Sequence, residues 1–321
     1  MTTFQLDHLQ TLAALVDEGT FDAAARRLHV TPSAVSQRVR AMEQVAGKTL
    51  VQRTTPVRTT PAGDVVLRYA RQVLLLARDA EAELGLEAQD RGRTSMAIAV
   101  NADSLATWFL DALAAVPREL GVVFDIRRED QDHSAALLRS GTVMAAVTAT
   151  PDAVQGCTSR ALGTMRYRAV CSPALIGRAG ADRAGADRAG AAPDPARLDD
   201  APMVVFDRKD DLQDRFLRDA GASAARSPRH YVPTSDGYAR AVVSGLGWGL
   251  LPEQQCLDHI ASGDLVELAP SAPVDVLLFW QRWSLASPLL DEVTRAVEAA
   301  ARAHLIAPVG QTARRRADPT G

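Results

Sequence analysis

The sequence is poor in cysteine and has no long apolar segment. Its three cysteines, Cys157, Cys171 and Cys256, lie far apart and match neither a CxxC motif nor a metal-ligand spacing. No apolar run approaches the roughly 18 residues of a membrane span. Residues 1–8 lack the charged and apolar regions of a signal peptide. We therefore expect a cytoplasmic chain with ordinary thiols and no membrane contact.

The motifs of several enzyme classes are also missing. We find no GxGxxG, P-loop, GxSxG or HExxH pattern, and no arrangement of Ser, His and Asp that marks a catalytic triad. The six histidines are scattered, and no pair has ligand spacing. These absences predict a protein that is not an enzyme and that needs neither a metal nor a cofactor.

Charge is distributed unevenly along the chain. The net charge of −3 by itself disfavours a nucleic-acid binder. Residues 20–60, however, contain only two acids, Asp22 and Glu43, against seven basic residues. A local basic patch of this kind can neutralise DNA phosphates. The basic residues of this segment are Arg26, Arg27, Arg38, Arg40, Lys48, Arg53 and Arg58.

The first sixty residues have the pattern of three short helices and a wing. Apolar residues at helical spacing predict a helix over Leu6–Val16, and Thr20 caps a short second helix. Thr31 is a good N-cap for a third helix, which begins at Pro32, runs to about Val45 and ends before Gly47. Leu50–Thr60 is expected to form two strands joined by a turn. Together these elements predict a winged helix-turn-helix.

In this fold the third helix lies in the major groove with its N-terminal residues at the base edges. We expect Ser33, Ser36 and Gln37 to contact bases. The remaining candidates contact the DNA backbone or position the helix: Thr31, Pro32, Arg38, Arg40, Arg53, Thr54, Thr55 and Arg58. The alternative is a three-helix interaction module whose basic face is accidental.

A longer helix is predicted from Pro61 to about Glu83. Its apolar residues recur at spacings of four and three over nearly three heptads, which favours a dimerisation seam. An amphipathic helix that lies on its own domain is the alternative. The seam consists of Val66, Ala70, Val73, Ala77, Ala80 and Leu84.

Beyond a polar linker at residues 89–94, strands alternate with helices, which predicts an α/β domain with a largely parallel sheet. Within it we expect helices over Ser104–Val116 and Pro288–Leu305 and a strand over Arg166–Cys171. The threefold repeat Arg178–Ala192 predicts an exposed loop, and the tail 307–321 is predicted to be disordered.

The first of these segments resembles a known family of DNA-binding proteins. The run from Ala24 to Gln37, together with Gly47, Arg53 and Thr60-Pro61-Ala62-Gly63, closely resembles the LysR-type transcriptional regulator signature. Many members carry Ser-Gln-Pro where this chain has Thr31-Pro32-Ser33. The difference bears on which base contacts form.

The resemblance covers nearly the whole chain and implies an α+β multidomain architecture. Residues 1–60 would form the winged helix-turn-helix, and residues 61–92 a long linker and dimerisation helix. Residues 93–306 would form a two-lobed α/β effector domain that resembles periplasmic binding proteins. Lobe I would span about 93–165 and 268–306, and lobe II about 166–267. Members of the family usually assemble as homodimers or homotetramers on double-stranded DNA, and RNA polymerase is a further candidate partner.

A narrower resemblance lies in four later stretches: NADSLATWF (101–109), EDQDH (129–133), FDRKDDLQ (206–213) and GLGWGLLPE (245–253). They look like the ArgP/LysG branch of the family, whose members sense lysine or arginine and control basic amino-acid export. The resemblance therefore implies a basic amino-acid effector. A different effector, or an architectural or replication-origin role, is the alternative.

Ligand-binding residues are expected after strand ends and at helix starts. Asp103, Ser104 and Thr107 follow the first strand of the α/β domain. Ser235 stands at a later helix start. A basic ligand needs acidic partners, for which the best candidates are Glu129, Asp130 and Asp132, with Asp207 as a further one. Ser104 as a simple N-cap and Asp132 as a helix-dipole residue are the alternatives. The remaining effector candidates are Asp103, Ser104, Thr107 and Thr148.

Overall fold

The computed structural model describes residues 4–85, 94–129, 131–176, 201–222 and 227–307. The chain forms two compact units. Unit 1 comprises residues 1–100, 115–160 and 280–296, and unit 2 comprises residues 101–114, 161–279 and 297–321. The repeat Arg178–Ala192, most of the polar linker and nearly all of the C-terminal tail lie outside the described residues.

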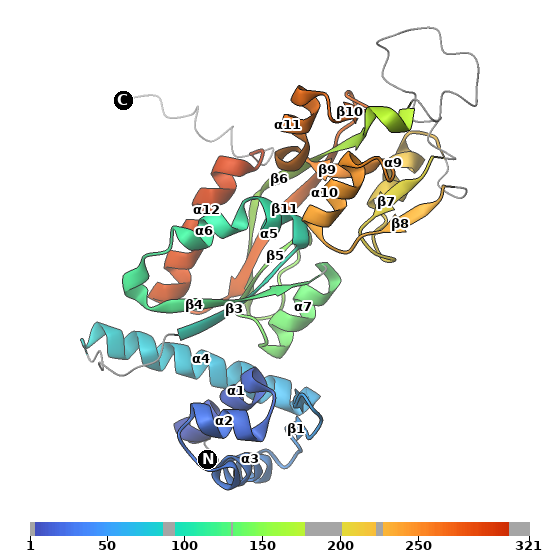
Figure 1. Cartoon of the computed structure of the whole chain (residues 1–321). Helices are drawn as coiled ribbons and strands as arrows, with labels where there is room; N and C mark the ends of the chain where they lie inside the picture. The colour runs from blue at the N-terminus through green and yellow to red at the C-terminus, as the bar shows by residue number, and fades with distance from the viewer. Residues whose placement is uncertain (1–3, 86–93, 130, 177–200, 223–226, 308–321) are drawn as a thin grey trace, which may run out of the picture. The chain divides into compact units, whose positions relative to one another are not determined.

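The N-terminal part of unit 1 has the predicted helices and wing (Figure 1). Helices α1 (Leu6–Glu18), α2 (Phe21–Arg27) and α3 (Pro32–Ala46) are followed by strands β1 (Val51–Gln52) and β2 (Arg58–Thr59). The two strands pair antiparallel, with Val51 opposite Thr59. Local signals explain these boundaries, because the side chains of Thr20 and Thr31 accept hydrogen bonds from the first turns of α2 and α3.

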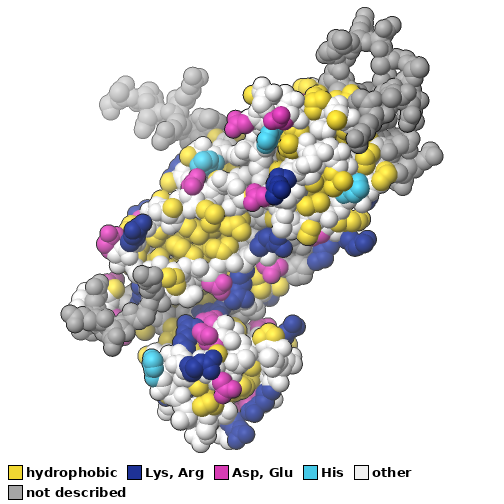
Figure 2. Space-filling model, in the orientation of Figure 1, with side chains coloured by type: hydrophobic (Ala, Val, Ile, Leu, Met, Phe, Trp, Pro, Cys, Tyr) yellow, Lys and Arg dark blue, Asp and Glu magenta, His cyan; other side chains and the backbone are white. Residues whose placement is uncertain are grey.

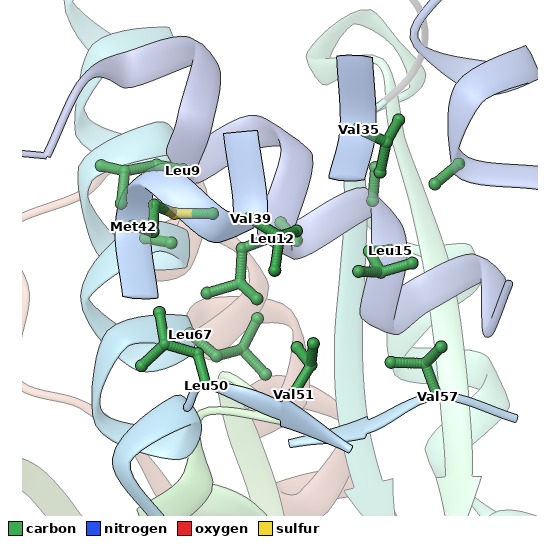
Figure 3. Packing of buried hydrophobic residues seen from close by; sticks show 14 of the residues in the cluster. Leu9, Leu12, Leu15, Val35, Val39, Met42, Leu50, Val51, Val57 and Leu67 are labelled. Carbon is green, nitrogen blue, oxygen red and sulfur yellow. The ribbon is translucent and has the colours of Figure 1, made fainter. Parts of the chain in front are cut away.

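The apolar side chains of these elements form one core, which holds α3 on the other helices (Figure 3). Leu9, Leu12 and Leu15 of α1 meet Val35, Val39 and Met42 of α3. Leu50, Val51 and Val57 close the core from the wing side. Burial of the apolar side chains of α3 fixes the orientation of this helix. Its opposite face therefore points to solvent or to a ligand.

Helix α4 (Pro61–Glu83) has the predicted length, and the first half of its apolar seam is not a free surface. Val66 and Ala70 are buried in the core of the N-terminal helices, and Val73 packs against it. The first half of the seam therefore covers the helix's own domain, which was the alternative interpretation. The exposed large apolar side chains of α4 form a different stripe, Val65, Tyr69 and Leu76.

The rest of unit 1 is a parallel sheet joined to α4 by arginine side chains. Strand β3 (Thr94–Val100) pairs parallel with β4 (Val122–Arg128) and β5 (Ala145–Thr148), and helix α7 (Gln131–Ser140) packs on it. Arg71 of α4 is buried, pairs with Asp17 and donates to the carbonyl oxygens of Gly141 and Thr142 at 2.6 and 2.5 Å.

Unit 2 contains antiparallel pairs, which differs from the predicted parallel sheet. The long strand β6 (Cys157–Cys171) pairs antiparallel with β9 (Gly249–Pro252) and β10 (Val266–Glu267). A separate parallel pair joins β7 (Met203–Val205) to β8 (Arg229–Tyr231). Strand β11 (Val274–Trp283) neighbours β6 in the order β10-β6-β11. The fold class, an N-terminal helix-turn-helix followed by a mixed α/β domain, is as predicted.

The helices of unit 2 include two departures from the sequence-based expectation. The helix expected over Ser104–Val116 is divided into α5 (Ala102–Thr107) and α6 (Phe109–Ala114), because the fully buried Trp108 leaves helical geometry. Helix α11 (Glu253–Ser262) was not predicted. The remaining helices are α9 (Leu212–Asp219), α10 (Ser235–Val243) and α12 (Pro288–His304). Helix α10 begins at Ser235 as expected, and α12, which begins in unit 1, lies where it was expected. None of the helices in the described part of the chain could cross a membrane.

Candidate functional site

The exposed face of α3 is the first candidate site. Ser33, Gln37 and Arg40 are exposed, and Ser36 is half-buried. These residues lie opposite the buried Val35 and Val39 of the same helix. Thr31 is exposed as well, but its hydroxyl accepts the Ala34 amide at 3.1 Å and so has a capping role. The polar face of α3 can therefore contact a groove while its apolar face stays in the core.

The basic residues predicted to contact phosphates differ in availability. Arg38 is half-buried, pairs with Asp7 at 3.2 Å and donates to the Thr11 hydroxyl at 3.2 Å. This arginine joins α3 to α1 and is less available to a phosphate than the exposed Arg40. Sequence spacing places Arg38 on the polar face, but only the packing of α1 shows that it has partners there.

The wing supplies two further exposed arginines, Arg53 and Arg58. The Arg53 guanidinium lies over the Phe21 ring, 5.4 Å from its centroid, which orients it beside α2. Thr54 donates to the Pro56 carbonyl at 2.7 Å and shapes the turn. Figure 2 shows Lys and Arg side chains on the surface of the N-terminal helices. The polar face of α3 and the wing together form an electrostatic and hydrogen-bonding surface suited to duplex DNA.

The second candidate site is a polar cluster in unit 2 around Asp103 of α5. The Tyr167 hydroxyl of β6 donates to Asp103 Oδ2 at 2.8 Å, and the Ser235 hydroxyl of α10 donates to Oδ1 at 2.7 Å. Gln255 of α11 donates from its amide to the Ser235 oxygen at 3.1 Å. Strand β6 and helix α10 thus each supply a donor to the carboxylate of α5, and both donors lie far from it in sequence, while α11 contacts the second donor.

The electrostatics of this cluster favour a cation. Burial raises the pKa of the Asp103 carboxyl group, and the nearby carboxylate of Asp210 raises that pKa further. The Asp210 carboxylate accepts the backbone amides of Phe206 and Leu212 at 3.1 and 3.0 Å, which hold it in place. Burial also raises the pKa of Tyr167 well above its usual value, so this phenol is a hydrogen-bond donor. A cationic ligand would compensate the carboxylates.

The other effector candidates of unit 2 differ in whether their side chains have hydrogen-bond partners. Asn101, rather than Ser104, caps α5 through its side chain. The Ser104 hydroxyl is buried without a hydrogen-bond partner among the described residues. Thr107 donates to the Asp103 carbonyl at 2.6 Å. Asp207 accepts the amides of Lys209 and Asp210 and so shapes the loop that carries Asp210. Only Asp103 and Ser235 of the predicted set contact each other directly through their side chains, as far as the described residues show.

The candidates in unit 1 are described only in part. Glu129 is half-buried after β4, and its amide donates to the Val100 carbonyl at 3.2 Å. Thr148 is buried and donates to the Thr150 carbonyl at 3.1 Å. Asp130 and the side chain of Asp132 lie outside the described residues. The acidic cluster predicted after the second strand therefore stays a prediction.

Sequence reasoning missed three members of the Asp103 cluster: Tyr167, Asp210 and Gln255. Tyr167 lies in a predicted strand, and alternation along that strand marks it only as a buried position. Asp210 stands within the stretch FDRKDDLQ, one of the four that resemble the ArgP/LysG branch, but nothing there distinguishes it from the acids beside it. Gln255 lies on the unpredicted helix α11.

Comparison with known families gives two matches that together cover most of the chain. Residues 6–64 match the family described as bacterial regulatory helix-turn-helix protein, lysR family. Residues 88–302 match the LysR substrate binding domain. The first match contains the exposed face of α3, and the second contains the Asp103 cluster.

Individual relatives match over nearly their full length. The HTH-type transcriptional regulator LysG of Mycobacterium tuberculosis is 46% identical over 300 residues, which cover 92% of this chain and 94% of the relative. The lysine export transcriptional regulatory protein LysG of Corynebacterium efficiens is 42% identical, covering 93% and 98%. The HTH-type transcriptional regulator ArgP of Pseudomonas aeruginosa is 36% identical, covering 97% of each chain.

Two solved structures resemble the fold at comparable identity. ArgP from Mycobacterium tuberculosis has a TM-score of 0.77 at 42% identity and covers 94% of this chain and 98% of its own. Full-length LysG from Corynebacterium glutamicum with bound effector Arg has a TM-score of 0.70 at 37% identity, covering 94% and 99%. The three relatives are named as transcriptional regulators, and none of them is named as an enzyme.

Proposed function

The chain belongs to the LysR family of bacterial helix-turn-helix transcriptional regulators, on its LysG/ArgP branch. From this premise we propose that it senses a basic amino acid, arginine or lysine, and changes transcription in response. The single observation that carries the proposal is the half-buried carboxylate of Asp103. The charged group that acts on it is a second carboxylate, Asp210, and a ligand cation would neutralise it.

The ligand class follows from this charge arrangement. Asp103 is held by hydroxyl groups, which orient a carboxylate but do not neutralise it. An ammonium or guanidinium group would pair with it by charge-assisted hydrogen bonds. The similar LysG structure from Corynebacterium glutamicum, which has bound effector Arg, supports the same ligand class. Glu129, Asp130 and Asp132 stay sequence-based candidates for an acidic partner of the ligand.

The proposed output is a change in DNA binding. Exposed Ser33 and Gln37 would read bases, while Arg40, Arg53 and Arg58 would contact phosphates. An effector alters this output only if it binds one arrangement of the protein better than another. In a homodimer or homotetramer, the spacing of paired helices on the operator would differ between the two arrangements.

The proposed targets are genes for basic amino-acid export, as the name of the Corynebacterium efficiens relative indicates for that protein. Contact with RNA polymerase would turn a change in operator binding into a change in transcription. A regulator of the bacterial chromosome works in the cytoplasm, and we propose that location.

The test combines calorimetry with footprinting on the full chain. We expect heats of binding for arginine or lysine and a changed footprint on DNA upstream of an exporter gene. Histidine, whose side chain is largely uncharged at neutral pH, serves as the comparison ligand. Absence of heat with arginine and lysine, together with unchanged footprints, would refute the effector. Recovery of DNA from many sites without promoters would favour an architectural role instead.

A further inference from the structure

The Asp103 cluster is built to hold a carboxylate, and in this structure it holds one of the chain's own. Each carboxylate oxygen of Asp103 accepts one hydroxyl hydrogen bond, from Tyr167 at 2.8 Å and from Ser235 at 2.7 Å. The Gln255 amide, at 3.1 Å from the Ser235 oxygen, steadies the second donor. Both donors, Tyr167 and Ser235, are buried, so water does not compete freely for their hydrogen bonds to the carboxylate.

This arrangement satisfies the carboxylate oxygens, but no cation among the residues that the structure describes pairs with them. The charged neighbour that acts on Asp103 is Asp210, another carboxylate. A buried charge without an opposite charge is costly, and a buried hydroxyl without a partner also costs free energy. A ligand that only neutralised Asp103 by drawing it away would remove the acceptor of the Tyr167 hydroxyl. It would leave the Ser235 hydroxyl only the more distant Gln255 Oε1, at 3.3 Å, in place of Asp103 Oδ1 at 2.7 Å.

A free amino acid can meet both requirements, because it carries a cation and a carboxylate on one molecule. We propose that the effector exchanges places with Asp103: its cationic group draws the Asp103 carboxylate away, and its own carboxylate accepts the hydrogen bonds of Tyr167 and Ser235. The number of hydroxyl–carboxylate bonds is then conserved, while the charge of Asp103 gains a partner. This inference rests on the proposed function.

The exchange also explains how binding could be sensed. In this structure, Asp103 directly joins α5 to β6 and α10 through two hydrogen bonds. After exchange, those elements would be joined through the ligand. The ligand would thus replace the direct hydrogen bonds of Asp103 with a bridge of different length. The states with and without ligand would then differ in their contacts, as a switch requires. A cation without a carboxylate would break the hydrogen bonds of Asp103 to Tyr167 and Ser235 without replacing them.

Calorimetry on the full chain with arginine and with agmatine, its decarboxylated analogue, tests the exchange. The variant Ser235→Ala removes one of the two hydroxyls, and Ser235→Thr keeps it. In the wild type, agmatine loses the Ser235–Asp103 bond on binding, whereas arginine replaces it. We therefore expect Ser235→Ala to tighten agmatine binding about tenfold, since a hydrogen bond to a charged group contributes about 1.5–3 kcal/mol. Arginine binding should change by less than about threefold.

The variant Tyr167→Phe should act in the same direction, and Ser235→Thr should restore the wild-type difference between the two ligands. The exposed residues Ser262 and Tyr231 give matched controls, Ser262→Ala and Tyr231→Phe, which should change neither affinity. Weaker arginine binding with unchanged agmatine binding in Ser235→Ala would show that Ser235 holds the ligand without exchange, and would overturn the inference. Equal changes for both ligands would also overturn it. Absence of arginine binding by the wild type would remove the proposed function and the exchange together.

Discussion

Replacement of Asp103 by asparagine tests the role of this carboxylate as the partner of the effector cation. The asparagine side chain would keep the size and an oxygen that can accept from Tyr167 or Ser235, but it would not carry the charge. Loss of one partner from a buried charge pair costs about 2–5 kcal/mol. At about 1.4 kcal/mol per tenfold change, a loss of about 3 kcal/mol weakens arginine binding roughly a hundredfold.

The measurement is the dissociation constant of arginine from the full chain by calorimetry. Asp236→Asn is the matched control, because Asp236 adjoins Ser235 on α10 but is exposed. This control removes the same charge from nearly the same place, and should weaken binding by less than about threefold, because exposed charges are screened. Thermal unfolding of both variants checks that the fold is retained.

A result in which both variants weaken arginine binding equally would show that only long-range charge matters. A result in which Asp103→Asn binds arginine as tightly as the wild type would refute the assignment of Asp103. In that case the acidic partner would have to be sought at Glu129, whose side chain is half-buried in unit 1.

Three other predictions concern DNA binding, the Arg71 contacts and pH. Arg40→Ala should weaken specific and non-specific DNA binding alike and lower the magnitude of the slope of log K against log salt by about one. Gln37→Ala should lower the free energy of binding by about 1–3 kcal/mol on the specific site only. Both are measured by fluorescence anisotropy over a salt series. Arg71→Met should lower the free energy of unfolding in urea by about 2 kcal/mol, because the Gly141 and Thr142 carbonyls and Asp17 lose their donor. Arginine affinity should be full above the raised pKa of Asp103 and fall as pH decreases through it, because the cation binds the ionised carboxylate; calorimetry between about pH 8 and about pH 5 measures this.

Each of these predictions has a control. Equal loss of specific and non-specific binding in Gln37→Ala would contradict base readout by that residue. Arg26→Met, an exposed change on α2, should leave the unfolding free energy within about 0.5 kcal/mol. The pH dependence should be absent from the residual binding of Asp103→Asn, and its persistence there would assign the titration to another group.

The N-terminal helices show how much local signals can predict. Thr20, Thr31 and Thr60 each accept a hydrogen bond from the amide three residues later, and such caps are visible in sequence because donor and acceptor are close along the chain. The seam of α4 shows the limit. Its spacing predicts an apolar stripe, but the partner of that stripe depends on the tertiary arrangement, and Val66 and Ala70 pack into the chain's own core.

The candidate effector site was predictable only in part. Position after a strand end singled out Asp103, and position at a helix start singled out Ser235. Their contact could not be inferred, because Ser235 is 132 residues from Asp103 in sequence and Tyr167 is 64 residues away. Pairing over such distances depends on strand order and helix placement, which also explains why the unpredicted helix α11 hid the role of Gln255.

The sequence by itself determined the helix-turn-helix, its basic character and the family, since these depend on capping residues, periodicity and local charge. Only the tertiary structure decided which side chains are available. It pairs Arg38 with Asp7 and leaves Arg40 exposed, and it surrounds Asp103 with two hydroxyls and a second carboxylate. The physical reason is that availability, burial and electrostatic environment are properties of neighbours in space, and those neighbours come from elements that the chain brings together only on folding.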